Sequence, residues 1–202
     1  MQCGRGGLIA DRIANPISDK FLQIRHERTL SLLDGKNPES ILDVGCGSGE
    51  FLSIFAERFP FANICGCDLL RKEVENAKKA CPRGEFYCGN FMELEFEPAE
   101  VVAMLEVLEH SNEPAEMLKK GASLAGKNGH VLVSIPRPEV PYWNVIWWAW
   151  SNTLGRKWRG QHSRLREAEL DLLASGYGLV KEKRKRFFLG CISMTLYRVG
   201  KE

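Results

Sequence analysis

An acidic residue and three glycines spaced two apart stand close together in the run DVGCGSG at residues 43–49. The apolar segment that leads into this run, residues 40–45, is typical of a short strand, and residues 50–59 repeat apolar side chains at intervals of three and four, as an amphipathic helix does. A strand, a glycine-rich turn and a helix in this order place free backbone N–H groups beside a bound ligand. The run therefore predicts a ligand-binding loop of the nucleotide-binding kind.

The spacing of the glycines excludes two kinds of phosphate-binding loop. Gly45, Gly47 and Gly49 are followed by Glu50, whereas the dinucleotide fingerprint G-x-G-x-x-G requires a glycine at that place. A carboxylate at the start of the helix would also repel a pyrophosphate. The sequence Gly-Lys-Ser/Thr does not follow, so the loop is not a P-loop. With Asp43 in front of it, the loop suits a ligand that has a cationic amino-acid end and no phosphate.

Strand-like and helical segments alternate along the chain that must position this loop. We expect strands at residues 40–45, 62–68, 85–88, 99–105 and 130–135, helices at residues 19–33, 50–59, 70–80, 114–124 and 166–174, and a closing hairpin of residues 178–188 and 191–199. This alternation predicts helices that cover a mostly parallel sheet. A length of 202 residues indicates one domain, in which residues 1–38 form an N-terminal helical cap and residues 136–163 form an aromatic-rich lid between the fifth strand and the last helix.

The composition is that of an ordinary globular protein, with 44% hydrophobic residues, 27% charged residues and a formal net charge of +2. So small a net charge does not argue for a nucleic acid or a membrane as partner. Residues 1–10 lack the apolar core of a signal peptide, and no apolar run reaches the about 20 residues that span a bilayer. The seven cysteines include no Cys-x-x-Cys pair, and we expect Cys65 and Cys67 to be buried on one face of a strand rather than to bind metal. Reduced thiols fit a cytoplasmic protein.

Four features together resemble the class I methyltransferase family. They are ILDVGCGSGEF at residues 41–51, Asp68 at the end of the second strand, Gly89-Asn90-Phe91 after the third strand, and residues 105–110 after the fourth. The resemblance covers residues 20–199 in segment order. It implies an α/β fold with a Rossmann-like, seven-stranded, mostly parallel sheet, helices on both faces and an antiparallel last strand. It also implies an enzyme that takes a methyl group from S-adenosyl-L-methionine.

The resemblance assigns a part of the cofactor to each of these positions. The loop would lie against the methionyl and ribose portions, Asp68 would accept hydrogen bonds from both ribose hydroxyls, and Leu105 would stand near the sulfonium. Asn90 and Phe91 would bind the adenine, the first through its amide and the second by apolar contact. The expected cofactor-binding residues are Arg25, Asp43, Gly45, Gly47, Gly49, Asp68, Leu69, Asn90, Phe91 and Leu105.

Three details are similar to the ubiquinone-biosynthesis O-methyltransferases and their small-molecule relatives. The first is the pattern Glu106-x-x-Glu109-His110, and the second is Arg25, which would reach the carboxylate of the cofactor. The third is Gly160-Gln161-His162, which leads into the last helix. These details identify a clan of methyltransferases and not a substrate.

Glu106, Glu109 and His110 have two chemical interpretations and a structural one. With His162 as a fourth ligand, they could bind a divalent metal such as Mg²⁺, which would hold a catechol or a ribose diol. Without a metal, His110 and Glu109 are the expected catalytic residues, because an imidazole suits the deprotonation of an attacking hydroxyl. In the structural interpretation, His110 packs in a turn and the glutamates face solvent.

Two segments bear on the methyl acceptor. Residues 136–160 contain all five tryptophans and turn basic near their end, at Arg156, Lys157 and Arg159. They could cover a hydrophobic acceptor, presented even from a membrane surface, or they could pack at the sheet edge or in a dimer interface. The run KEKRKR at residues 181–186 favours a charged edge strand over an RNA-binding surface.

The leading hypothesis is therefore methylation of a small, hydrophobic acceptor by in-line displacement, with an oxygen favoured over a nitrogen or a carbon as the methylated atom. Methylation of a terminal RNA ribose with a divalent metal is the runner-up, and a non-catalytic protein that binds S-adenosylmethionine is the third hypothesis. The identity of the acceptor and the oligomeric state, monomer or homodimer, stay open.

Overall fold

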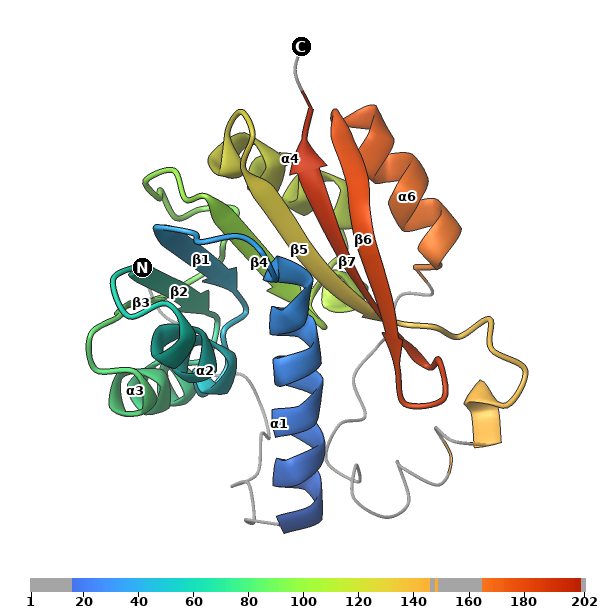
Figure 1. The fold of residues 1–202 in the computed structure, drawn as a ribbon, viewed down its shortest axis with the longest axis horizontal. Coiled ribbons are helices and arrows are strands. Elements are labelled where there is room, and N and C mark those ends of the chain that lie inside the picture. Colours follow the sequence, from blue (N-terminus) through green and yellow to red (C-terminus); the bar gives the residue numbers. More distant parts are fainter. Residues whose placement is uncertain (1–15, 146–147, 149–164, 201–202) are drawn as a thin grey trace.

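The computed structural model describes residues 16–145, 148 and 165–200 of the chain. Its strands are β1 (Ser40–Val44), β2 (Asn63–Asp68), β3 (Glu85–Cys88), β4 (Val101–Leu105), β5 (His130–Pro136), β6 (Leu179–Phe187) and β7 (Ile192–Val199). They form one sheet in the order β3-β2-β1-β4-β5-β7-β6 (Figure 1). Strand β7 is antiparallel to both of its neighbours, and the pairs from β3 to β5 are parallel. The Rossmann-like sheet with an antiparallel last strand is confirmed.

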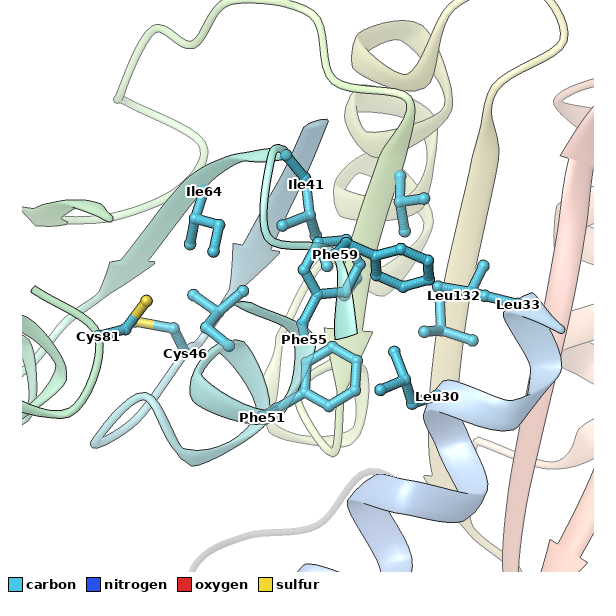
Figure 2. Close-up of a cluster of buried hydrophobic side chains, with 14 of the residues drawn as sticks. Leu30, Leu33, Ile41, Cys46, Phe51, Phe55, Phe59, Ile64, Cys81 and Leu132 are labelled. Atoms are coloured by element: carbon cyan, nitrogen blue, oxygen red, sulfur yellow. The ribbon is translucent and has the colours of Figure 1, made fainter. Parts of the chain in front are cut away.

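The helices divide the core into two halves. They are α1 (Pro16–Leu30), α2 (Glu50–Arg58), α3 (Arg71–Ala80), α4 (Pro114–Ala125) and α6 (Glu167–Gly176), with short 3₁₀ turns at Ser31–Leu33 and Leu108–His110. Side chains of α1 and α2 pack on one face of the sheet (Figure 2), where side chains of α3 join them. Side chains of α4 and α6 pack on the other face. Successive strand residues point to opposite faces, so Val101 belongs to the first half and Val102 to the second.

The expected bounds of the elements agree with the structure to within a few residues. The helix expected at residues 19–33 is α1 followed by a 3₁₀ turn. The turn of the closing hairpin spans residues 188–191, whereas a turn of residues 189–190 was expected. In this longer turn Phe188, Leu189 and Gly190 all have positive φ angles, of 50°, 53° and 82°. Residues 1–15 of the expected cap and residues 146–147 and 149–163 of the expected lid lie outside the described residues. No helix in the described part of the chain is both long and apolar enough to cross a membrane.

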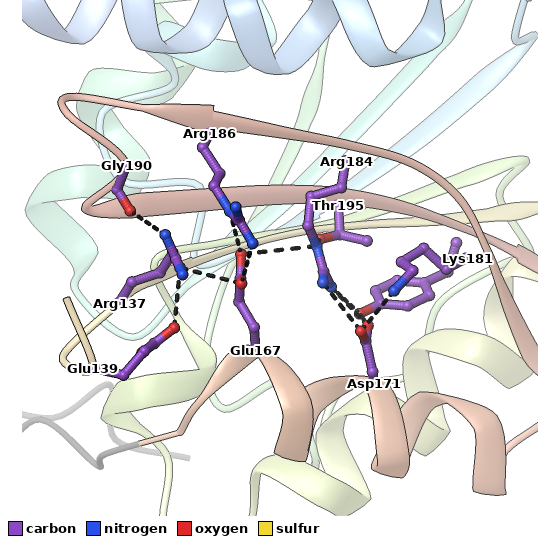
Figure 3. Close-up of polar contacts among 10 residues, drawn as sticks. Arg137, Glu139, Glu167, Asp171, Lys181, Arg184, Arg186, Gly190 and Thr195 are labelled. Atoms are coloured by element: carbon purple, nitrogen blue, oxygen red, sulfur yellow. Dashed lines mark hydrogen bonds and ion pairs between the residues drawn. The ribbon is translucent and has the colours of Figure 1, made fainter.

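Strand β6, which contains the basic run at residues 181–186, lies at an edge of the sheet as expected. Its arginines pair with acids of α6 (Figure 3): Arg184 donates to Asp171 at 2.6 Å, and Arg186 donates to Glu167 at 2.9 Å. The lysines of the run also have partners within the molecule, at Asp171, at the backbone oxygen of residue 34 and at Ser31. The basic charges therefore join the edge strand to neighbouring elements.

Candidate functional site

The glycine loop begins at the carboxyl end of β1, the central strand of the parallel part of the sheet. The backbone N–H groups of Gly45 and Cys46 both donate to the carbonyl of Cys67 in β2, at 2.8 and 3.0 Å. Helix α2 starts directly afterwards, at Glu50. The loop is therefore fixed between two strands and a helix N-terminus. It lies at the carboxyl ends of the parallel strands, where open α/β folds bind their ligands.

The three glycines of the loop all have positive φ angles, but only two of them are packed against protein. A Cβ atom on Gly45 would stand 2.5 Å from Cγ2 of Val107, and one on Gly49 would stand 2.9 Å from the Cα of Ala77. A Cβ atom on Gly47, where φ is +52°, would meet no atom within 4 Å. Gly47 thus borders open space, which a ligand could occupy without displacing the protein.

Asp68 closes β2 and faces this loop. Its Oδ2 atom accepts a hydrogen bond from the N–H of Gly47 at 3.0 Å, and its Oδ1 atom accepts one from the N–H of Leu70 at 2.9 Å. Burial raises the pKa of Asp68, and the two N–H donors oppose that effect. The next side chain, Leu69, is 61% exposed, which is unusual for leucine and leaves an apolar surface beside the carboxylate.

Asp43 is the most deeply buried acid of the loop region. Its side chain is 3% exposed, and Oδ1 has no hydrogen-bond partner among the described residues. Burial raises the pKa of Asp43 well above the ordinary value, and the nearby charge of Asp68 adds to this effect. A buried polar atom without a partner is uncommon in folded proteins, so this oxygen indicates a missing donor.

The turn after β3 holds Asn90 and Phe91. Asn90 accepts a hydrogen bond from the N–H of Met92 at 3.1 Å and donates one to Glu93 at 3.3 Å. The ring of Phe91 is 4% exposed and lies beneath the ammonium of Lys120, 5.1 Å from the ring centroid. A ring this deeply buried offers little surface for the expected contact with adenine.

The turn after β4 carries the two glutamates. Glu106 has a positive φ of 58°, and its Oε1 atom accepts a hydrogen bond from the hydroxyl of Ser134 in β5 at 2.8 Å. Glu109 is 2% exposed, so the structural interpretation in which both glutamates face solvent is wrong for this residue. Its Oε2 atom has no hydrogen-bond partner among the described residues. Burial, and then the charge of Glu106, raise the pKa of Glu109, and Arg25 of α1 opposes them.

The structure therefore brings both Glu106 and Arg25 within electrostatic reach of Glu109. His110 is exposed at the end of the 3₁₀ turn that contains Glu109. Within the described ranges, no three His, Cys, Asp or Glu side chains are arranged to hold a metal ion, and His162 lies outside those ranges. The metal site stays a prediction.

Sequence reasoning missed Ser134 as a residue of this site. The signal was present, because Ser134 is the one hydroxyl in the apolar segment HVLVSIP of β5. A lone polar residue near the carboxyl end of a buried strand needs a hydrogen-bond partner, and strand ends are where α/β proteins place their ligands.

The fold and the site together define a class of protein. A mostly parallel sheet carries a glycine loop at the end of its first strand, an acid at the end of the next strand, and a buried unpaired acid at the start of the loop. This arrangement suits a nucleoside joined to a cationic group rather than to a phosphate.

The comparison with protein families agrees with that class. A model of the methyltransferase domain matches residues 18–183. The chain therefore belongs to the methyltransferase domain family, whose class I members use S-adenosylmethionine.

Similar proteins are distant. A ubiquinone biosynthesis O-methyltransferase of Idiomarina loihiensis is 31% identical over 140 residues, which is 66% of this chain and 57% of that protein. A demethylmenaquinone methyltransferase of Thermotoga maritima is 33% identical over 70 residues, 35% of this chain and 31% of that protein. The matches thus span less than two thirds of the length of these curated relatives.

Solved structures share the fold at low identity. The magnesium protoporphyrin IX methyltransferase of Synechocystis, with bound S-adenosylhomocysteine, has a TM-score of 0.71 and 19% identity, and covers 94% of this chain and 90% of that one. A putative methyltransferase of Bacillus halodurans has a TM-score of 0.70 and 14% identity, with coverage of 87% and 99%.

Proposed function

We propose that this chain transfers a methyl group from S-adenosyl-L-methionine to an oxygen atom of a small, hydrophobic acceptor by in-line displacement. The observation that supports S-adenosylmethionine as the methyl donor is the buried Oδ1 atom of Asp43, which has no hydrogen-bond partner among the described residues. Asp43 lies at the start of the glycine loop, and there is open space over Gly47 in that loop. The ammonium of the methionyl group would supply the donor and the positive charge that this oxygen lacks. The residues present therefore fit the cofactor.

The other loop residues support the same placement. An ionised carboxylate has about four acceptor positions, so Asp68 can accept bonds from ribose hydroxyls in addition to those from Gly47 and Leu70. The exposed side chain of Leu69 would be covered by the adenine, and Asn90 would hydrogen-bond its edge. Arg25 would bind the carboxylate of the methionyl group.

The sulfonium of the bound cofactor supplies an activated methyl group, so the protein mainly aligns the acceptor and excludes water. The reacting atoms need to be about 3 Å apart and in line. His110 is the predicted base, because its side chain is exposed in the turn after the carboxyl end of β4. Burial raises the pKa of Glu109, so this residue is suited to hold a proton rather than to remove one.

The preference for a hydrophobic acceptor rests on exposed apolar side chains in the segment after β5 and in the turn between β6 and β7. Tyr142, Trp148 and Leu189 are 44%, 67% and 73% exposed, and the hydroxyl of Tyr142 donates to the backbone oxygen of Leu189. Such a surface suits an apolar acceptor, or a lipid surface that delivers one. Flotation with anionic lipid vesicles tests the lipid contact, and protein that stays at the bottom of the gradient removes it.

RNA methylation is the second candidate because of the basic run in β6. The partners of Arg184 and Arg186 within the molecule count against it, since these charges are already paired. RNA binding through this strand would weaken steeply as salt is added. Weak binding that is insensitive to salt, or no binding, excludes this candidate.

The direct test of the donor site is Asp68→Ala, with cofactor affinity measured by calorimetry. Loss of hydrogen bonds from two hydroxyls to a charged group, each worth about 1.5–3 kcal/mol, should weaken binding at least tenfold. The matched control is Asp34→Ala, which removes an exposed acid paired with Arg58 away from the loop. Unchanged affinity in Asp68→Ala contradicts the assignment. Formation of S-adenosylhomocysteine with an acceptor panel then separates an enzyme from a non-catalytic binding protein.

A further inference from the structure

Ser134 is a buried hydroxyl in an otherwise apolar strand. Its side chain is 1% exposed, and its neighbours Val133 and Ile135 are not exposed at all. A hydroxyl in such a place is costly unless it is hydrogen-bonded, and its partner here is the Oε1 atom of Glu106, at 2.8 Å. The hydroxyl of Ser134 is therefore satisfied by a contact with the turn after β4.

Ser134 holds the backbone of Glu106 as well as its side chain. The N–H of Glu106 donates to the carbonyl of Ser134 at 3.1 Å. The positive φ of Glu106, 58°, costs a residue with a side chain about 1–2 kcal/mol, so this conformation persists because its surroundings impose it. Ser134 thus holds both the backbone N–H and the side-chain carboxylate of Glu106.

The side chain of Glu106 keeps one unused oxygen. Its Oε2 atom makes no hydrogen bond to any residue that the structure describes, and the side chain is half-buried. The nearby Glu109 is almost fully buried and also has an oxygen, Oε2, without a partner. Two carboxyl groups at one strand end therefore have unused capacity for hydrogen-bond donors.

This turn lies directly against the donor site. Val107, the residue after Glu106, contacts Gly45 so closely that a Cβ atom on the glycine would stand 2.5 Å from it. Because β1, β4 and β5 are parallel neighbours, a group bound by Glu106 would lie at the same carboxyl end of the sheet as the glycine loop, where the methionyl end of the cofactor is proposed to bind.

We propose that Ser134 is a positioning residue, which holds the carboxylate of Glu106 so that its Oε2 atom accepts a hydrogen bond from the acceptor's hydroxyl and orients the acceptor oxygen until that proton passes to His110, the predicted base. This inference rests on the proposed function, and it narrows the acceptor to molecules with an O–H donor. Phenols and catechols have that chemistry in an apolar frame.

The first measurement needs no acceptor. The side-chain couplings of Glu106 are followed by NMR in protein with ¹³C-labelled glutamate, with Glu106→Gln for assignment. We expect one rotamer in the wild-type protein, averaging in Ser134→Ala, and a single rotamer again in Ser134→Thr, which keeps the hydroxyl. Ser193→Ala removes an equally buried serine from β7, and it should leave Glu106 unchanged. A single unchanged rotamer in Ser134→Ala overturns the proposal.

The second measurement follows S-adenosylhomocysteine formation with caffeate, an alkylcatechol, an aryl amine and an aryl thiol, once with chelator and once with added Mg²⁺. We expect turnover of the hydroxyl compounds, a loss of about tenfold or more in kcat in Ser134→Ala, and a cofactor Kd within about twofold of wild type. Parallel losses in kcat and cofactor affinity overturn the proposal, because Ser134 would then shape the donor site.

The remaining outcomes separate this inference from the proposed function. Turnover that requires a divalent cation means that Glu106 holds the ion, and it overturns the direct contact. Turnover of the amine or thiol alone overturns the hydroxyl acceptor while leaving a methyltransferase. If none of the compounds gives product, the proposed O-methylation fails, and the acceptor role of Glu106 fails with it.

Discussion

Replacing Gly47 with alanine tests the cofactor site with little interference from folding. The φ angle of Gly47 is +52°, so an alanine pays about 1–2 kcal/mol for the left-handed conformation. No atom lies within 4 Å of the added Cβ, so no clash is added to this cost. The new methyl group would instead enter the space that we assign to the cofactor. We expect cofactor binding to weaken at least tenfold, which corresponds to about 1.4 kcal/mol.

Two other glycines provide matched controls. Gly35 precedes β1 at the opposite end of the strand, has a φ of +85° and also has no atom within 4 Å of an added Cβ. Gly35→Ala should therefore cost about the same 1–2 kcal/mol of stability and leave cofactor affinity unchanged. Gly49→Ala would place its Cβ 2.9 Å from the Cα of Ala77, so overpacking should add about 1–3 kcal/mol to the conformational cost.

For each variant, the assay measures both the free energy of unfolding and the affinity for the cofactor. Denaturant unfolding without cofactor gives the free energy of unfolding, and calorimetry with S-adenosylhomocysteine gives the affinity of the folded protein. Stability should fall least, and equally, in Gly35→Ala and Gly47→Ala, and most in Gly49→Ala. If Gly47→Ala binds the cofactor as tightly as Gly35→Ala does, the cofactor does not lie over the loop, and the donor site is misplaced.

Two acids give predictions that depend on pH. Because burial raises the pKa of Asp43, the free protein loses stability as pH rises above the ordinary carboxyl range. Asp43→Asn should remove that loss, so that the variant is more stable than wild type at pH 8 in denaturant unfolding, and it should bind the cofactor more weakly. A variant that binds as tightly as wild type contradicts the ammonium contact. Arg184 and Lys181 help to hold the pKa of Asp171 at about 2, below the ordinary aspartate value of 3.8, so the stabilisation is present above pH 3.8 and disappears as pH falls toward 2. Asp171→Asn should cost about 1–2 kcal/mol at pH 7, given that the side chain is 28% exposed, and the difference from wild type should vanish in acid; a difference that persists there refutes this explanation.

The order of the elements could be predicted from the sequence because it depends on local patterns. The short strand β3, Glu85–Cys88, has the bounds that the sequence indicates, and α2 begins at Glu50 directly after the glycine loop. The hairpin turn at residues 188–190 was harder, because Phe188 and Leu189 adopt positive φ angles that their residue types do not favour.

The site was predicted less completely because its contacts join distant strands. The hydrogen bond from Ser134 to Glu106 requires β4 and β5 to pair with Leu105 opposite Ser134, and this register cannot be read from either segment alone. Glu109 is buried because it lies in the 3₁₀ turn that follows β4. A run of acidic residues in the sequence, in contrast, suggests side chains that are exposed to solvent. The same reasoning applies to Phe91, whose ring enters the core.

The contact between Gly45 and Val107 joins the two halves of the proposed reaction. The glycine loop would fix the donor, and the turn that contains Glu106 would fix the acceptor oxygen. Since a Cβ on Gly45 would already be too close to Val107, the two segments have no room to shift independently. In the proposed arrangement, packing between these two segments would therefore help to set the distance between donor and acceptor. This arrangement is what in-line transfer requires, because a displacement of about 1 Å can cost a hundredfold in rate.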